Sequence, residues 1–510
     1  MVTRISGFSS GLDIDELVKK MMSTQKAPLN KLNQQKTVIE WQREQYRTLN
    51  SKLVDFRNNK LSTFGLSNSI GAKQATITGN SSAVTATASS SAVNGSMSIN
   101  VTSLATAANA KSTAGIGNVS MTDSIESLIA SGKLDSSILV GDKVTIDVAG
   151  ATPIELNKSD TLGTLMSRLN NSKEANVNAY IDSYTGTLVL TSKTTGKTAG
   201  VDNVVPPLNV SGAIFGAGGF KLGATQDGAN AVLSINGIAT ERSSNTFTEN
   251  GVTITLNAAS LGTASNIVVS TNTDKIMDTI KSFISEYNSL IEGLNNKLSE
   301  ERYRKYTPLS TEQKDAMKDD EIKLWEEKAK SGLLRNDTTL SGIVSDMRLA
   351  SVTSVDINGN KVNLSSFGIT TGDWTQRGKL VIADDSKLRA AIEADPDAVI
   401  KFFTQQTTES DPKKKGSATN PDNGLFNRLS NIVMTGLERL ATKAGTSKYS
   451  TDVTSTFLAN STMGEQLRTI DKKIDSATLR LNMIETRYYK QFTAMEKAMN
   501  RYNAQSSIFS

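Results

Sequence analysis

The sequence predicts a multidomain α+β protein, with terminal coiled-coil helices, a mixed helical domain, and two nested β-rich modules. Three observations support this fold class. Apolar residues recur every seven positions near both chain ends, residues 74–110 contain no charged side chain and alternate with period two, and helical periodicity returns from Thr273. Helices therefore enclose β-structure, as in a chain that runs out to a tip and returns.

The heptad rows at the two ends have the a/d spacing of a coiled coil. A stripe this narrow is buried only against other helices, of this chain or of a neighbour. Because both ends carry it, we interpret it as an assembly interface. The residues we assign to this interface are Leu32, Ile39, Tyr46, Leu53, Leu467, Ile470, Ile474, Leu481, Ile484, Tyr488, Met495 and Tyr502.

Residues 12–64 are expected to be helical. Asp13 can cap a first segment, and Pro28 suits the first turn of a second, longer helix, where its missing N–H costs nothing. The second row of the N-terminal heptads, four residues before the first, includes Gln35 and Gln42. Since this row is half polar, we expect the N-terminal end to be loose until it assembles with a partner.

The middle of the chain is expected to form strands. Alternating apolar residues in 74–110 and 226–272 predict half-buried antiparallel strands, and Asn236–Gly237 predicts a tight hairpin. Residues 111–225 predict a strand–helix–hairpin module, with Leu162, Leu165 and Leu169 on the inner face of the helix. The Gly-rich run 212–219, together with Pro206–Pro207, is typical of a linker or loop.

Helical patterns then resume, with a short β excursion over 352–383 and a last helix over 462–505. Ser310 to Gln313 forms a capping-box pattern, and Asp337 can cap the helix that follows it. These patterns divide the chain into four nested domains. They are a terminal coiled-coil leg (1–45 with 456–510), a mixed, mainly helical domain (46–73 with 273–455), a β-rich domain (74–110 with 226–272) and a β-rich tip domain with a short helix (111–225).

The composition argues against an enzyme. The chain has no cysteine and no histidine, which removes thiolate nucleophiles and the commonest general base and metal ligand. We therefore expect no catalytic, metal or cofactor-binding residues. The net charge of +5 is small for 510 residues, so we expect no nucleic-acid partner. There is no apolar leader and no run of membrane-spanning length, so we expect neither a cleaved signal peptide nor a membrane partner.

Four motifs have simpler explanations than catalysis or ligand binding. Gly7 to Gly11 matches G-x-S-x-G, but Ser9 would lack a histidine base. Gly196–Lys197–Thr198 resembles the end of a P-loop without its first glycine. Asp356 begins a stretch like a calcium loop that lacks the required glycine and final carboxylate. The basic and aromatic cluster 302–306 is expected to end a helix.

Several segments resemble the flagellar hook-associated protein 2 family, the filament caps. They are ISGFSSGLDIDELVKKMM at the N-terminal end, FTAMEKAMNRYNAQSSIF at the C-terminal end, and EYNSLIEGLNNKL, PLSTEQKDAMKDDEIKLWEEKAKSGLLRND and SSFGITTGDWTQRGKLVIADDSKLRAAIEADPDAVIKFF between them. The resemblance covers essentially the whole chain. The module 144–195 also resembles repeats of other flagellar axial proteins.

The resemblance implies an extracellular protein at the tip of the bacterial flagellum. Its partners would be copies of itself in a ring, exported flagellin that inserts and folds beneath the cap, the hook-associated junction proteins, and an export chaperone that binds the C-terminal helix. Export would use the flagellar type III apparatus without a cleaved leader. Two alternatives stay open, a surface adhesin that binds host mucin and another flagellar axial (junction) protein.

Overall fold

The computed structural model of the protein describes residues 13–197 and 208–509. The chain divides into two compact units. The helical unit contains the residues up to Gly71 and those from Thr273 onward, and the β unit contains Ala72–Asn272. Both ends of the chain belong to the helical unit, so the β unit is an insertion between two helices. The combination of helices with several small sheets confirms the predicted multidomain α+β class.

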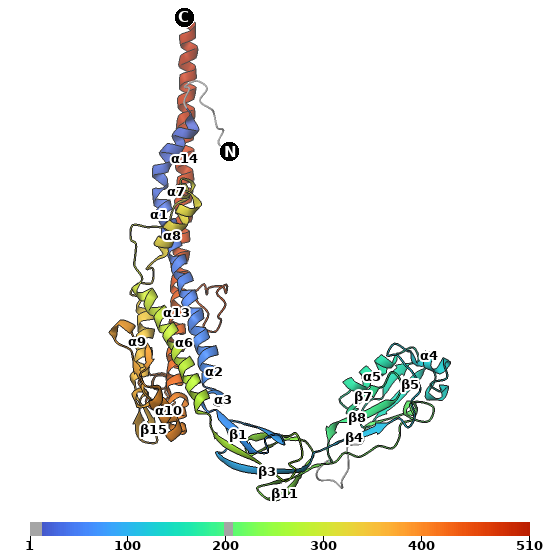
Figure 1. Cartoon of the computed structure of the whole chain (residues 1–510). Helices are drawn as coiled ribbons and strands as arrows, with labels where there is room; N and C mark the ends of the chain where they lie inside the picture. The colour runs from blue at the N-terminus through green and yellow to red at the C-terminus, as the bar shows by residue number, and fades with distance from the viewer. Residues whose placement is uncertain (1–12, 198–207, 510) are drawn as a thin grey trace. The chain divides into compact units, whose positions relative to one another are not determined.

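The longest helices of the helical unit are those at its two ends, and they lie side by side (Figure 1). They are α1 (Ile14–Asp55) and α14 (Thr462–Phe509). Asp13 caps α1, because its carboxylate accepts a hydrogen bond from the Glu16 N–H at 2.9 Å. The prediction of two N-terminal helices was wrong. α1 passes through Pro28 without a break, and Pro28 is exposed, so water can reach the backbone carbonyl that the proline leaves unpaired.

The remaining helices pack around the continuation of α1. A π-helical turn (Phe56–Leu61), α2 (Ser62–Phe64) and α3 (Ser67–Ile70) complete the N-terminal part. After the β unit come α6 (Thr273–Ser299), α7 (Thr311–Asp315), α8 (Asp319–Lys330), α9 (Thr338–Val352), α10 (Asp385–Ala394), α11 (Pro396–Thr404), α12 (Pro412–Lys415) and α13 (Leu425–Ala444). The predicted β excursion is two hairpins, β15 (Val355–Ile357) with β16 (Asn360–Val362), and β17 (Ile369–Thr371) with β18 (Leu380–Ile382).

Aromatic rings form the centre of the helical unit. Phe283 of α6 lies with its ring centroid 4.9 Å from that of Phe426 and 6.0 Å from that of Phe403. Gly436 of α13 allows a close approach of α9, since a Cβ at this position would lie 2.6 Å from Ile343 Cδ1. These contacts bury the predicted apolar face of α6 and bring α1, α6, α9 and α13 together.

The described residues of the β unit form two separate hydrophobic cores. The first lies in the sheet β1-β14-β3-β10-β11 and the sheet β12-β13-β2, which are antiparallel, and it includes Ile99, Leu233 and Ile254. The strands are β1 (Lys73–Gly79), β2 (Val84–Ala88), β3 (Gly95–Ser103), β10 (Ala231–Ile235), β11 (Ile238–Arg242), β12 (Thr246–Glu249), β13 (Val252–Leu256) and β14 (Ser265–Thr271). The predicted Asn236–Gly237 hairpin joins β10 to β11.

The second core belongs to the tip module. It comprises the sheets β4-β8-β7 and β6-β5-β9 with two short helices. The elements are β4 (Ala107–Lys111), α4 (Ile125–Ala130), β5 (Lys143–Val148), β6 (Ile154–Asn157), α5 (Leu162–Asn171), β7 (Val177–Ile181), β8 (Leu188–Thr195) and β9 (Val210–Ser211). As predicted, Leu162, Leu165 and Leu169 are buried in this core.

Residues 212–219 were predicted to form a linker or loop, and the structure shows a packed loop with a short 3₁₀ turn (Ala213–Phe215), not a linker. Ile214 and Phe220 are completely buried in the tip core, and β9 pairs with β5 just before them. The glycines permit this packing, because a Cβ at Gly219 would lie 1.8 Å from the Ile214 carbonyl oxygen. The prolines of the predicted linker, Pro206 and Pro207, lie outside the described residues.

Candidate assembly interface

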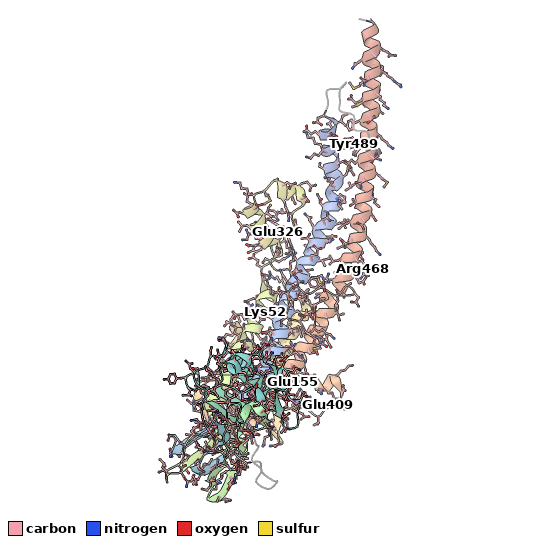
Figure 2. All side chains as sticks on the ribbon, turned by 90° about the vertical axis from the view of Figure 1, so that its right-hand side faces the viewer. Lys52, Glu155, Glu326, Glu409, Arg468 and Tyr489 are labelled. Atoms are coloured by element: carbon pink, nitrogen blue, oxygen red, sulfur yellow. The ribbon has the colours of Figure 1, made fainter. Side chains whose placement is uncertain are left out.

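The two terminal helices pair within one chain and run antiparallel. Asp15, near the start of α1, accepts a 2.8 Å hydrogen bond from the Tyr489 hydroxyl of α14. Further along α1, the Lys36 ammonium lies 2.8 Å from the Asp471 carboxylate. Figure 2 shows Tyr489 against the start of α1, with Arg468 further down α14. The heptad stripes are therefore partly buried by contacts within one chain.

The pairing of α1 with α14 is loosely packed between two buried positions of α14, Met463 and Leu481. Ile14, Val18 and Met22 are buried with Leu481 in a small apolar cluster, which we call the leg cluster. Leu29, Ile484, Tyr488, Tyr489 and Phe492 pack against it and are partly buried. Between Glu465 and Arg480, by contrast, no residue of α14 is buried. Along this stretch the helix pair buries too little of its apolar stripe to form a complete core.

An open apolar groove follows this loosely packed stretch. Val38 and Ile39 of α1, Pro308, and Ile470 of α14 line a groove of ≈ 1010 Å³. Lys31 and Lys473 also line the groove. Neither ammonium has an ion-pair partner among the residues that the structure describes. A groove of this kind between two helices can accept the apolar face of a third helix, as in a helical bundle.

The predicted interface residues fall into three groups. Tyr46, Leu53 and Leu481 are buried, and Met495 and Tyr502 are exposed. The others are partly buried, namely Leu32, Ile39, Leu467, Ile470, Ile474, Ile484 and Tyr488. Tyr46 and Leu53 are 3% and 0% exposed, so they are not available to a neighbouring molecule in this conformation. Their row continues from the leg into the core of the helical unit.

Tyr46 belongs to a buried polar network. Its hydroxyl donates a 2.6 Å hydrogen bond to Asp337 Oδ2, and the Lys443 ammonium lies 2.5 Å from the same oxygen. The other oxygen of Asp337 accepts from the Leu340 N–H and caps α9, as predicted. Burial by itself would raise the pKa of Asp337, but the hydrogen bonds from Lys443, Tyr46 and Leu340 outweigh it and lower the pKa below its usual value. Burial and the hydrogen bond to Asp337 raise the pKa of Tyr46.

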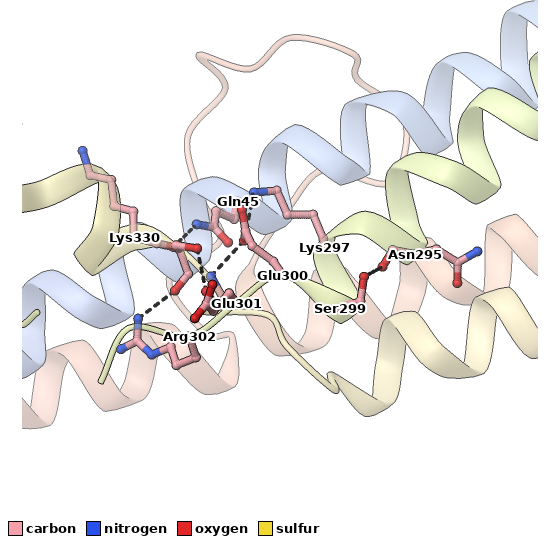
Figure 3. Close-up of polar contacts among 10 residues, drawn as sticks. Gln45, Asn295, Lys297, Ser299, Glu300, Glu301, Arg302 and Lys330 are labelled. Carbon is pink, nitrogen blue, oxygen red and sulfur yellow. Dashed lines mark hydrogen bonds and ion pairs between the residues drawn. The ribbon is translucent and has the colours of Figure 1, made fainter. Parts of the chain in front are cut away.

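The segment between α6 and α9 is fastened to α1 and has its own caps (Figure 3). Gln45 of α1 donates to the Lys330 carbonyl at 2.8 Å. Arg302 donates to the carbonyls of Ala329 and Ser331 at 2.7 and 3.0 Å, at the end of α8. We predicted that the cluster 302–306 ends a helix. It instead follows α6, which ends at Ser299, and its first arginine caps the C-terminus of a different helix.

Sequence reasoning missed the contacts that hold the connection between α13 and α14. The guanidinium carbons of Arg43 and Arg47 lie 4.1 and 4.7 Å from the ring centroid of Phe457. Arg43 Nε also donates to the Ala444 carbonyl at 2.9 Å, and Arg47 donates to the Ser455 carbonyl at 3.0 Å. Two arginines one helical turn apart and a phenylalanine in a polar segment were the available signal.

The rejected motifs have structural roles where the structure describes them. The Gly196 N–H donates to the Thr106 carbonyl, and the Lys197 N–H donates to Asn230, so these amides already have partners. The Asp356 carboxylate accepts from the Gly359 N–H within a hairpin. The G-x-S-x-G stretch and Thr198 lie outside the described residues. Residues 13–197 and 208–509 contain no cluster of three or more acidic side chains suited to a metal ion. None of the described helices combines the length and apolar character that a membrane crossing needs.

Comparisons with known proteins identify the family. The model of the flagellar hook-associated protein 2 C-terminus matches residues 228–504, and the model of its N-terminus matches residues 10–108. The flagellin hook IN motif matches residues 137–194, which include most of the module predicted to resemble axial-protein repeats.

Relatives match over nearly the whole length of the chain. A flagellar hook-associated protein 2 from Halalkalibacterium halodurans is 31% identical over 98% of both chains, and one from Escherichia coli K12 is 28% identical over 98% of this chain and 96% of its own. The crystal structure of the flagellar cap protein FliD D1-D2-D3 domains from Escherichia coli is similar in fold. Its TM-score is 0.50 at 22% identity, over 84% of this chain and 99% of that chain. The chain therefore belongs to the flagellar hook-associated protein 2 family.

Proposed function

We propose that the chain caps the distal end of the bacterial flagellar filament, where it assembles with copies of itself and promotes the insertion and folding of exported flagellin. The observation that carries this proposal is the family match over 98% of the chain. The solved Escherichia coli structure to which it is similar in fold is also described as a flagellar cap protein. The proposed role is structural, and no catalytic step is part of it.

The terminal helices would act as legs that contact neighbouring subunits. The groove lined by Val38, Ile39, Pro308 and Ile470 supports this role, because it is an apolar surface that the chain itself leaves open. Subunits that meet head to tail form a ring when the rotation from each subunit to the next adds up to one full turn. The leg cluster is small, so the legs would adjust at low cost to a filament whose symmetry differs from that of the ring.

The finer partners follow from the same role. We propose that an export chaperone covers α14 before assembly, that hook-associated junction proteins lie beneath the cap, and that export uses the flagellar type III apparatus. The long exposed faces of α14 support a chaperone site, since Leu479 and Met483 are 65% and 66% exposed. An apolar surface of this kind needs cover in a monomer that awaits export.

Deletion of the gene tests the proposed function. Electron microscopy of the deletion strain should show hooks without filaments, and flagellin should accumulate as soluble protein in the medium. Expression of the chain from a plasmid should restore the filaments. Normal filaments in the deletion strain would contradict the proposal.

A surface adhesin is the second candidate. The tip module exposes Tyr180 and Tyr184, which are 63% and 82% exposed, and aromatic faces of this kind contact sugar rings. The full chain should then bind mucin, and a variant with both tyrosines replaced by Ser should bind less. Equal binding by the two proteins would remove this candidate.

A further inference from the structure

Five Asn–Gly dipeptides occur in the chain, at 94–95, 236–237, 250–251, 358–359 and 423–424. Glycine has no side chain to block its nitrogen, so this nitrogen can attack the side-chain carbonyl carbon of the preceding asparagine. A bond forms between the glycine N and the asparagine Cγ, the bond from Cγ to the amide nitrogen breaks, and ammonia leaves with the glycine proton. Water then opens the ring and leaves isoaspartate or aspartate. Because the reaction consumes only water, the surroundings of each asparagine decide which one reacts.

Three of the five dipeptides have nearly the same backbone. Asn236, Asn250 and Asn358 have φ of 52°, 50° and 56°, and the glycines that follow have φ of 82°, 80° and 87°. Each pair is the two-residue turn of a hairpin, where both residues take the left-handed conformation. Any difference in reactivity between these sites must therefore come from contacts of the asparagine side chain and of the glycine that follows it.

Two of these turns restrain a reacting group. The side-chain oxygen of Asn236 accepts a 2.9 Å hydrogen bond from the Ser98 N–H, which holds its carbonyl carbon toward β3. The Gly359 N–H, which follows Asn358, donates a 2.8 Å hydrogen bond to the Asp356 carboxylate. That bond occupies the nucleophile, and the nearby negative charge opposes loss of its proton.

The two dipeptides outside these turns are also restrained. Asn423 is 2% exposed, and the Gly424 N–H donates to the Gln405 carbonyl at 2.7 Å. The side-chain oxygen of Asn94 accepts from the Lys73 ammonium at 3.0 Å. The Gly424 N–H must release the Gln405 carbonyl before its nitrogen can attack, and the Lys73 contact fixes the orientation of the Asn94 side-chain amide.

At Asn250 neither reacting group is restrained, although the turn itself is held, because the Gly251 carbonyl accepts a 2.9 Å hydrogen bond from the Ser89 N–H and Gly251 packs against Ala92. The Asn250 side chain is exposed, and in the part of the chain that the structure describes neither that side chain nor the Gly251 N–H has a hydrogen-bond partner. We propose that Asn250 is a site of spontaneous deamidation, at which this protein accumulates isoaspartate faster than at its other Asn–Gly dipeptides.

The modification would alter the end of a sheet. Isoaspartate adds one carbon to the main chain of a turn whose length fits two residues, and so opposes the pairing of Glu249 with Val252. It also adds a negative charge beside Glu249, whose carboxylate lies 3.0 Å from the guanidinium of Arg242. We expect the outer strand β12 to loosen from β13 as the protein ages.

The test is peptide mapping of the full chain by mass spectrometry after incubation at neutral pH, with isoaspartate identified by enzymatic carboxyl methylation. One ordinary hydrogen bond corresponds to about a fivefold change in rate, so Asn250 should react at least about five times faster than Asn236 or Asn358. Asn250→Gly, which suits the turn, should remove the dominant isoaspartate signal.

A second pair of variants tests the reasoning in the opposite direction. Asp356→Ala frees the Gly359 N–H and should raise the rate at Asn358 by about fivefold. Asp356→Asn keeps an acceptor oxygen and should leave most of the protection in place. The proposal is overturned if another Asn–Gly dipeptide reacts as fast as Asn250, or if Asp356→Ala leaves the rate at Asn358 unchanged.

Discussion

The Tyr46 hydroxyl should stabilise the fold of the helical unit, although heptad spacing alone places Tyr46 on an assembly stripe. Tyr46→Phe removes one oxygen that donates a 2.6 Å hydrogen bond to the Asp337 carboxylate, and Tyr46 is 3% exposed. A hydrogen bond to a charged group contributes about 1.5–3 kcal/mol. For a unit of this size, each kcal/mol lowers Tm by about 2 °C, so we expect a fall of about 3–6 °C.

The assay is thermal and denaturant unfolding of the full chain, followed by circular dichroism of the helices. A double-mutant cycle with Asp337→Asn isolates the contact, because asparagine can still cap α9 while losing the charge. In the Asp337→Asn background, Tyr46→Phe should cost less than about 1 kcal/mol, the value of a neutral hydrogen bond. An equal cost in both backgrounds, or a single-variant cost below about 0.5 kcal/mol, would refute the reasoning.

Three further predictions concern other parts of the molecule. The lowered pKa of Asp337 stabilises the fold fully above the unfolded pKa of about 3.9, and this stability is lost as the pH falls through the lower folded pKa. The Tm difference between the native chain and Asp337→Asn should therefore shrink in acid. The double variant Ile39→Asp with Ile470→Asp should abolish filament growth, while its free energy of unfolding changes by less than about 1 kcal/mol. The control Ile39→Leu should leave filament growth normal, and filaments from the double variant would exclude the groove as an interface. Ile214→Ala should destabilise the tip module by about 2–5 kcal/mol, measured by hydrogen exchange of β5 and β8, and normal protection would mean that 212–219 is a linker after all.

Local patterns predicted most of the secondary structure. The period of two in the middle of the chain, the Asn236–Gly237 turn and the caps at Asp13 and Asp337 all act over a few residues, and the structure contains each of them. The interpretation of the Gly-rich run as a linker was wrong because its glycines allow a close approach to the Ile214 backbone. Composition does not reveal such a tertiary contact. The prediction that a new helix begins at Pro28 was wrong because an exposed helix can lose one backbone hydrogen bond and continue past the proline.

The candidate interface was only partly predictable, for a physical reason. A heptad row shows that a helix face is apolar, but it does not show what covers that face. Along the N-terminal row the cover changes, from an open groove at Ile39 to the closed core of the helical unit at Tyr46 and Leu53. The groove also depends on Pro308, which is distant in sequence from both helices and carries no heptad signal.

The position of the protein on the flagellum tests the central claim most directly. Immunogold labelling of intact cells, with an antibody raised against the β unit, locates the chain by electron microscopy. The account predicts label at the distal tip of each filament and none along the shaft. Label distributed along the shaft, or confined to the junction with the hook, would contradict it.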